Sequence, residues 1–180
     1  MRSSTKLMIA LPFLLGTLPT QALAATFIYT GTLSGANEVP ANASTATGSY
    51  TVTLDDVANS VIVSLTFAGL AANASAGHIH CCAGIGVNAP VVIPFTGFPA
   101  ALSGSYTNTF TGVSATNVNG IKGGLAYVNI HNALFPGGEI RGQINAAAAV
   151  PELTSWAMMI GGAGLVGGML RRRKNARAFA

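Results

Sequence analysis

The sequence predicts an all-β domain, an antiparallel Greek-key β-sandwich or barrel of about eight strands, flanked by an N-terminal signal peptide and a C-terminal transmembrane helix. Three observations predict this fold. Apolar and polar residues alternate with the period of a strand in several short runs. Clusters of Gly, Pro, Asn and Asp separate these runs. Finally, no stretch of residues 25–149 shows convincing helical periodicity, and we find no second domain there.

Residues 1–24 have the three-part pattern of a secretory signal. Arg2 and Lys6 charge its front, and an apolar stretch follows. Ala22-Leu23-Ala24 then supplies the small residues that signal peptidase accepts, so we expect cleavage before Ala25. Two prolines interrupt the apolar stretch, which disfavours a membrane span.

Between the two ends, the strand pattern recurs from residue 26 to residue 144. The expected strands are 26–33, 50–54, 60–67, 77–80, 91–95, 105–110, 124–131 and 138–144. The pattern is clearest in 60–67, where Val61, Val63 and Leu65 alternate with other residues. Asp55 and Asp56 fall in a hairpin connection, where acidic residues most often solubilise a turn.

Two of the three histidines lie one residue apart in Gly77-His78-Ile79-His80. Because side chains alternate across a sheet, His78 and His80 should project from one face, roughly 7 Å apart along the strand. Ile79 should then point into the core. The same alternation in 124–131 leaves Asn129 and His131 on the outer face.

In the last expected strand, Ile140 and Ile144 should point inward and Glu139, Arg141 and Gln143 outward. If these strands are neighbours, the three histidines, Glu139 and Arg141 form one outward-facing cluster.

Three imidazoles suit copper or zinc, so we interpret His78, His80 and His131 as candidate metal ligands, with Cys82 and Glu139 as further candidates. The alternative is a structural polar cluster of Glu38, Glu139 and Arg141. In it, His131 and Glu139 hold the end of the sheet, and Arg141 pairs with Glu38 or Glu139. Glu38 lies in a loop, where an acid more often caps a turn or pairs with arginine than catalyses. We expect no catalytic residues.

The only two cysteines, Cys81 and Cys82, directly follow this histidine pair. Export favours oxidation of the two cysteines. The first interpretation is a vicinal disulfide or a pair of free thiols. An intermolecular bridge comes second. Continued alternation would put Cys82 on the histidine face, so a metal ligand is the third alternative.

Residues 153–170 carry no charge and are about long enough to cross a bilayer as a helix. Arg171, Arg172 and Arg173 follow within a basic end, 171–180, which should stay cytoplasmic. Val150-Pro151-Glu152, the glycine-rich span and the arginine cluster together resemble a PEP-CTERM sorting signal, although Leu153 replaces a usual second proline. The resemblance implies transient anchoring, removal by an exosortase-type protease, and bacteria that make extracellular polysaccharide.

The basic charge of the chain, +4, belongs to these two ends. Residues 25–149 contain two basic and four acidic side chains, a net charge of −2. We therefore expect no nucleic-acid partner.

Four ordered motifs give a second resemblance, which covers nearly all of residues 25–149. Leu33-Ser34-Gly35-Ala36-Asn37-Glu38-Val39-Pro40, Gly77–His80, Tyr127–His131 and Pro136–Ile144 are similar to those of a CHRD domain. The two cysteines stand where that family has a glycine-rich turn. The resemblance implies a β-sandwich in an exported protein, and it implies little chemistry.

The order of His-x-His, a later strand ending in His131, and Arg141 also resembles copper-zinc superoxide dismutases, which are Greek-key barrels. The region that would hold their bridging histidine reads Gly86-Val87-Asn88-Ala89-Pro90-Val91-Val92 here. A complete two-metal site cannot be assembled, so dismutase activity is not expected.

These observations favour a non-enzymatic structural or adhesive protein of the cell surface or extracellular polysaccharide matrix. The alternative is an exported copper- or zinc-binding protein, with redox activity as an extension. A sugar-binding module has no residue-level support in the sequence.

Overall fold

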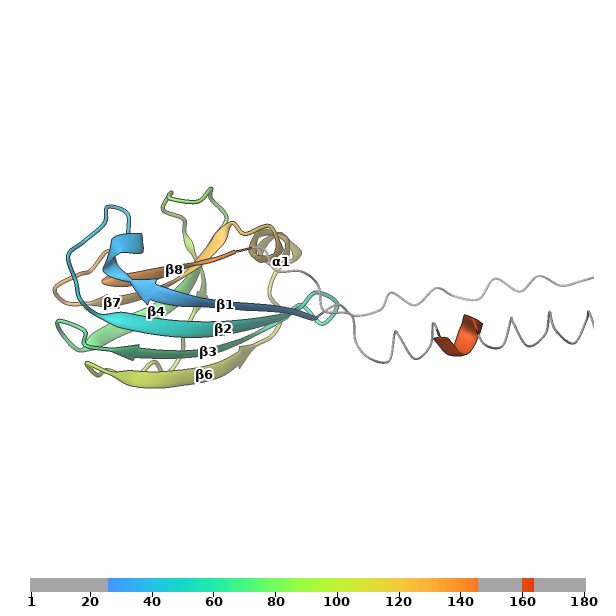
Figure 1. The fold of residues 1–180 in the computed structure, drawn as a ribbon, viewed down its shortest axis with the longest axis horizontal. Coiled ribbons are helices and arrows are strands. Elements are labelled where there is room, and N and C mark those ends of the chain that lie inside the picture. The colour runs from blue at the N-terminus through green and yellow to red at the C-terminus, as the bar shows by residue number, and fades with distance from the viewer. Residues whose placement is uncertain (1–25, 146–159, 164–180) are drawn as a thin grey trace, which may run out of the picture.

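The computed structural model describes residues 26–145 and 160–163 (Figure 1). Residues 26–145 form an eight-stranded antiparallel sheet that curls nearly into a barrel. This confirms the predicted all-β, antiparallel fold. The strands are β1 (Thr26–Ser34), β2 (Thr47–Asp55), β3 (Ser60–Ala68), β4 (Ala74–Cys81), β5 (Val91–Pro94), β6 (Gly104–Phe110), β7 (Ala126–Asn132) and β8 (Ile140–Ile144).

The strand order is β5-β4-β7-β8-β1-β2-β3-β6. The meander β1–β2–β3 follows the sequence, whereas β3–β6, β4–β7 and β8–β1 are neighbours that are distant along the chain. The first and last strands therefore lie side by side, and their pairing joins the two halves of the sheet at Ser34 and Arg141.

The core fills the concave side of the curled sheet, because one set of alternating side chains points there. Val61, Val63 and Val52 are completely buried on one half, and Ile79 and Val128 on the other. Full burial of each such side chain contributes about 1.5–3 kcal/mol. The hydrophobic alternation read from the sequence therefore predicts the core correctly.

Two short helices accompany the sheet. The 3-10 helix η1 (Gly35–Asn37) follows β1, and α1 (Ala115–Lys122) lies between β6 and β7. The expectation that residues 25–149 contain no helix is wrong at α1. Its eight residues bury only Val118, Gly120 and Ile121, too short a stripe for periodicity to reveal. Ser114 caps it by accepting a hydrogen bond from the Asn117 backbone N–H.

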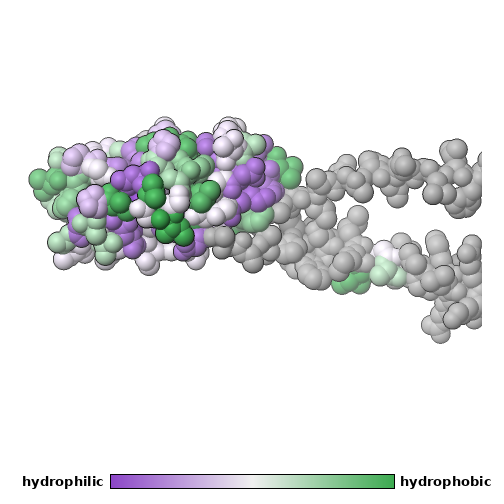
Figure 2. All heavy atoms as spheres, turned by 90° about the horizontal axis from the view of Figure 1, so that it is seen from above, coloured by the Kyte–Doolittle hydropathy of each residue, from purple (hydrophilic) through white to green (hydrophobic). Residues whose placement is uncertain are grey.

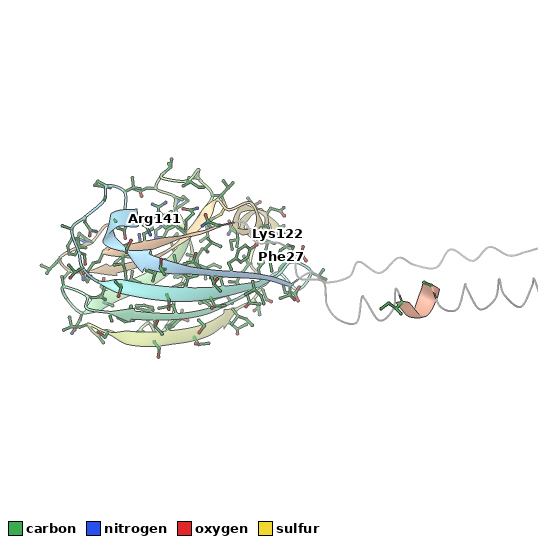
Figure 3. All side chains as sticks on the ribbon, in the orientation of Figure 1. Phe27, Lys122 and Arg141 are labelled. Atoms are coloured by element: carbon green, nitrogen blue, oxygen red, sulfur yellow. A yellow bond between two sulfur atoms is a disulfide. The ribbon has the colours of Figure 1, made fainter. Side chains whose placement is uncertain are left out.

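The Phe27 ring, Lys122 and Asp56 attach α1 to the sheet. Lys122 forms an ion pair with Asp56 at 2.6 Å, and its Nζ lies 4.6 Å from the centroid of the Phe27 ring. Figure 3 shows Phe27 and Lys122 together beside α1, with Arg141 away from them toward η1. The hairpin expected at Asp55 is also present, because Asp55 accepts hydrogen bonds from the backbone N–H groups of Val57 and Ala58.

The predicted signal peptide and nearly all of the predicted sorting tail lie outside the described residues. Residues 160–163 form a helical turn. No helix within 26–145 or 160–163 is long and apolar enough to cross a membrane. Figure 2 shows the upper side of the domain, where hydrophobic and hydrophilic side chains intermingle. The exposed apolar residues include Ile85 and Val87, in the loop of residues 82–90 between β4 and β5.

Candidate metal centre

Three histidines meet on the face of β4 and β7 that points away from the core. In register, His78 lies opposite Asn129, and His80 opposite Tyr127. His131 follows two residues after Asn129 on the same face of β7. Between them, Ile79 and Ile130 point into the core and are completely buried. The strands are neighbours, as the clustered arrangement requires.

The histidines lie on the outward face, as expected, but much of this face is covered, and His78 and His131 are half-buried. Only 8% of His80 and 2% of Arg141 are exposed, and Glu139 is completely buried. Loops cover the face: Ala89 in the 82–90 loop and Pro136 after β7 each contact a histidine. Alternation identifies the face of a side chain, but it carries no information about loops that fold over that face.

The histidines point nitrogen atoms at one another. One potential ligand nitrogen from each of His78, His80 and His131 lies within 4.8 Å of the other two. Nδ1 of His78, Nε2 of His80 and Nε2 of His131 are all buried and have no hydrogen-bond partner. Such unpaired buried nitrogens are costly, since most buried polar atoms are hydrogen-bonded.

Two backbone carbonyls determine which nitrogen of the ring carries the hydrogen. Nδ1 of His80 lies 2.8 Å from the Ala89 oxygen, and Nδ1 of His131 lies 3.0 Å from the Pro136 oxygen. A carbonyl can only accept a hydrogen bond, so each Nδ1 is the donor. The lone pair of each neutral ring is then on Nε2. This is the arrangement typical of histidines that bind metals.

All three imidazoles are held in their neutral form at pH 7. Burial, together with smaller contributions from charge repulsion by His131 and His80, lowers the pKa of His78 to about 4. Burial also lowers the pKa of His80 and of His131 below the ordinary value. Neutral imidazole is the form that coordinates a metal ion.

Tyr127 lies between His80 and Arg141. The Tyr127 ring is parallel to the His80 ring, with 4.7 Å between centroids, and the Arg141 guanidinium carbon lies 3.3 Å from the Tyr127 centroid. Since β4 and β8 flank β7 on opposite sides, these contacts form a stack across three strands. The Tyr127 hydroxyl also accepts a hydrogen bond from the Ala89 N–H at 3.1 Å. Tyr127 was missed in the sequence, although its spacing from His131 places it on the same face.

Glu38 lies beside this stack and does not pair with Arg141. It is 6% exposed and accepts a hydrogen bond from the Asn129 amide at 3.1 Å. Burial raises the pKa of Glu38 to about 7, against the opposing effects of the Arg141 charge and the Asn129 hydrogen bond. Arg141 instead donates to Asn88 Oδ1 and to the Val87 carbonyl oxygen.

Glu139 has a separate set of partners and is not grouped with the histidine nitrogens. Its carboxylate accepts hydrogen bonds from the Ser44 hydroxyl, the Ala71 backbone N–H and the Asn132 amide. These partners come from three different loops or strand ends. Glu139 therefore cross-links these segments, whereas Arg141 does not form the expected ion pair with Glu38 or Glu139 among the described residues.

Cys82 also lies apart from the histidines. A disulfide joins Cys81 to Cys82, Cys81 is buried in the core, and Cys82 is exposed. The Cys82 sulfur contacts Thr116 and Asn117 of α1 at 4.0 Å. With its sulfur bonded to Cys81 and turned toward α1, Cys82 offers no thiolate to the histidine cluster.

Comparison with known proteins identifies one family. The sequence pattern of the CHRD domain matches residues 29–144, which span β1 to β8. No curated protein and no solved structure matches the chain.

Proposed function

This chain belongs to the CHRD domain family, and we propose that it is a copper- or zinc-binding protein with His78, His80 and His131 as ligands. The family name assigns no chemistry to the histidine cluster, so the proposal rests on the geometry of the three side chains. The observation that carries the proposal is the convergence of three buried nitrogens that have no hydrogen-bond partner. A bound cation would satisfy all three at once.

The distances are compatible with one ion after a small adjustment. Histidine nitrogens bind zinc or copper at about 2.0–2.1 Å, so two ligands of one tetrahedral ion lie about 3.3 Å apart. The nitrogens here are within 4.8 Å, so side-chain rotations of about an ångström would complete the set. Three protein ligands leave a fourth position open, as in catalytic zinc sites. Copper should compete more strongly than zinc for the imidazoles.

The protein should work outside the cytoplasm. The predicted signal in residues 1–24 and the predicted sorting tail in residues 150–180 support this location. A disulfide between Cys81 and Cys82 is also typical of an oxidising compartment. On this reading the tail anchors the chain in the membrane until an exosortase-type protease removes it.

Elemental analysis of the full chain, purified in detergent without a His-tag or chelator, tests the metal proposal. We expect about one copper or zinc ion per chain. The His78→Ala/His80→Ala variant should lose it, and Ser75→Ala, an exposed residue of the same strand, should keep it. Wild-type protein that stays empty after incubation with Cu²⁺ and Zn²⁺ would overturn the proposal.

A passive role in the cell-surface or polysaccharide matrix is the second candidate. The outer face of β2, β3 and β6 favours it, because hydroxyl side chains there hydrogen-bond across strands instead of forming a charged or catalytic cluster. Ser49 contacts Thr66 at 3.0 Å, and Thr107 donates to Ser64 at 3.2 Å. Cosedimentation with purified exopolysaccharide tests this role, which does not require the histidines. Equal binding by the metal-free double variant would support it, and no cosedimentation would count against it.

A further inference from the structure

A polar cavity of about 370 Å³ lies between β1, β2, β8 and the 82–90 loop. Its polar lining comes from Thr32, Asn37, Tyr50, Arg141, Gln143 and Asn145. No histidine lines the cavity, so it is distinct from the candidate metal centre, with which it shares only the neighbourhood of Arg141. Its volume is within the range of pockets that hold small molecules.

Arg141 gives this cavity a positive charge that has no direct ion-pair partner among the described residues. The side chain is 2% exposed, and its two hydrogen bonds go to neutral oxygens of Asn88 and Val87. Across residues 26–145, the only ion pair joins Lys122 to Asp56. Buried charges in proteins are normally paired, because removing an ion from water is costly. Glu139 directs its carboxylate to other partners. Glu38 is near enough to interact with the Arg141 charge but forms no ion pair with it, so a ligand anion would provide the direct partner that Arg141 lacks.

The other polar groups present hydrogen-bond acceptors to the cavity. Asn37 donates its amide to the Arg141 carbonyl, and Gln143 donates its amide to the Gly124 carbonyl. The Tyr50 hydroxyl donates to the Gln143 carbonyl at 2.5 Å. Each of these side chains has used a donor within the protein and keeps an oxygen that can accept. A ligand with hydroxyl groups can donate to these oxygens and can also accept from the second amide N–H of Asn37 and of Gln143.

A cavity that offers one cationic side chain and several hydrogen-bond acceptors is suited to a ligand that has one carboxylate and several hydroxyl groups. We propose that this cavity binds a sugar acid, with the carboxylate on Arg141 and the hydroxyl groups on Asn37, Gln143 and Tyr50. Arginine has five N–H donors and uses two of them within the protein, so a carboxylate can still bind through two parallel hydrogen bonds. The same chemistry occurs in a free uronate and in the end of an acidic polysaccharide.

Titration calorimetry on the full chain tests this proposal with glucuronate, glucose and a glucuronate-ended oligosaccharide. We expect glucuronate to bind at least tenfold more tightly than glucose, which has the hydroxyls but no carboxylate. Equal affinities for the two sugars, or no binding of glucuronate, would overturn the proposal. Tighter binding of the oligosaccharide than of free glucuronate would assign the site to polysaccharide ends, and the reverse to the free acid.

Two variants of exposed β1 residues provide a matched comparison. Thr32→Glu places a carboxylate in the cavity beside Arg141, and Thr30→Glu makes the same change two residues away, outside the cavity lining. Glucuronate binding should be lost in Thr32→Glu and retained in Thr30→Glu. Equal loss, or no loss, in both variants would contradict the assignment. Metal content should be unchanged in both, so this test is independent of the metal proposal.

Discussion

The imidazole ring of His80 stacks on the phenol ring of Tyr127, with an angle of 4° between the ring planes and 4.7 Å between the ring centroids. The same tyrosine accepts a hydrogen bond from the backbone N–H of Ala89, whose carbonyl oxygen contacts His80 Nδ1. Tyr127 therefore orients His80 twice, by stacking on its ring and by holding the residue that fixes its tautomer.

Replacing Tyr127 should weaken metal binding without removing a ligand. In Tyr127→Leu both the stack and the hydroxyl are lost, and we expect metal affinity to fall about 10–100-fold, as for other groups that orient ligands. Tyr127→Phe keeps the ring, so its metal affinity should lie between that of Tyr127→Leu and that of the wild type. Competitive titration with a chromophoric chelator measures the change. Wild-type affinity in the leucine variant would show that Tyr127 has no orienting role.

The buried carboxyl of Glu38 should make stability depend on pH. Its pKa is raised from 4.5 to about 7 in the folded protein, so the folded state holds the proton more tightly. The resulting stabilisation is complete below pH 4.5 and is lost as pH rises through 7. Glu38→Gln, which is neutral at every pH, should exceed the wild type in unfolding free energy at pH 8 by about 1–3 kcal/mol. The two should be similar at pH 4.

His78 contributes the opposite dependence over an overlapping range. Its folded pKa is about 4 against an ordinary value of 6.5, so its stabilisation is present above pH 6.5 and is lost as pH falls toward 4. In the wild type, Glu38 partly offsets this loss. The unfolding free energy of Glu38→Gln should therefore fall more steeply between pH 6.5 and 4.5. Urea unfolding with EDTA present measures both curves, and parallel curves would contradict the assignment.

Glu139 should matter for stability and not for metal content. Its carboxylate accepts hydrogen bonds from three donor groups within the fold, including one of 2.6 Å from the Ser44 hydroxyl. Glu139→Gln replaces one acceptor oxygen with a donor facing other donors, so we expect a loss of about 2–4 kcal/mol by urea unfolding. Ser44→Ala removes one partner and should cost less. A folded Glu139→Gln protein that lacks metal would restore Glu139 as a candidate ligand.

Gly138 should tolerate no side chain, whereas its neighbour should. Its φ is +130°, and a Cβ there would lie 2.5 Å from Asn129 Oδ1 and 2.7 Å from Glu38 Oε1. Gly138→Ala should therefore lose about 1–3 kcal/mol from backbone strain, with the clash adding to it. A Cβ on the exposed Gly137 would meet nothing within 4 Å, so Gly137→Ala should stay within about 0.5 kcal/mol of the wild type. Thermal unfolding of both variants measures this difference in stability. Equal unfolding temperatures for the two variants would contradict the prediction.

Much of the fold could be predicted from the sequence because strand alternation reports directly on faces. Ile79 and Val128 are in the core, and His78 and His80 share the opposite face, as their spacing indicates. The helix α1 could not be found in the same way. It has only eight residues, with a glycine and β-branched side chains among them, and its one local signal is the cap at Ser114.

The candidate site was predicted in its ligand types but not in its surroundings. Arg141 carries no sequence signal that it would stack on Tyr127 and bond to Asn88, because those contacts depend on how the 82–90 loop folds back over the sheet. Likewise, Ala89 contacts His80 through its backbone, so its side chain could not reveal the role. Long-range loop contacts of this kind require the three-dimensional structure.

The pairing of the first strand with the last also has a mechanical consequence. β1 and β8 are antiparallel neighbours, and the first residue of β1 and the last residue of β8 lie at the same end of the sheet, the end where α1 lies (Figure 1). Tension between Thr26 and Ile144 therefore peels these strands apart one contact at a time instead of shearing them together. The backbone pairing between the two strands is at Ser34 and Arg141, the positions farthest from Thr26 and Ile144, and it would open last. A pulled domain should thus yield at low force from α1 toward η1.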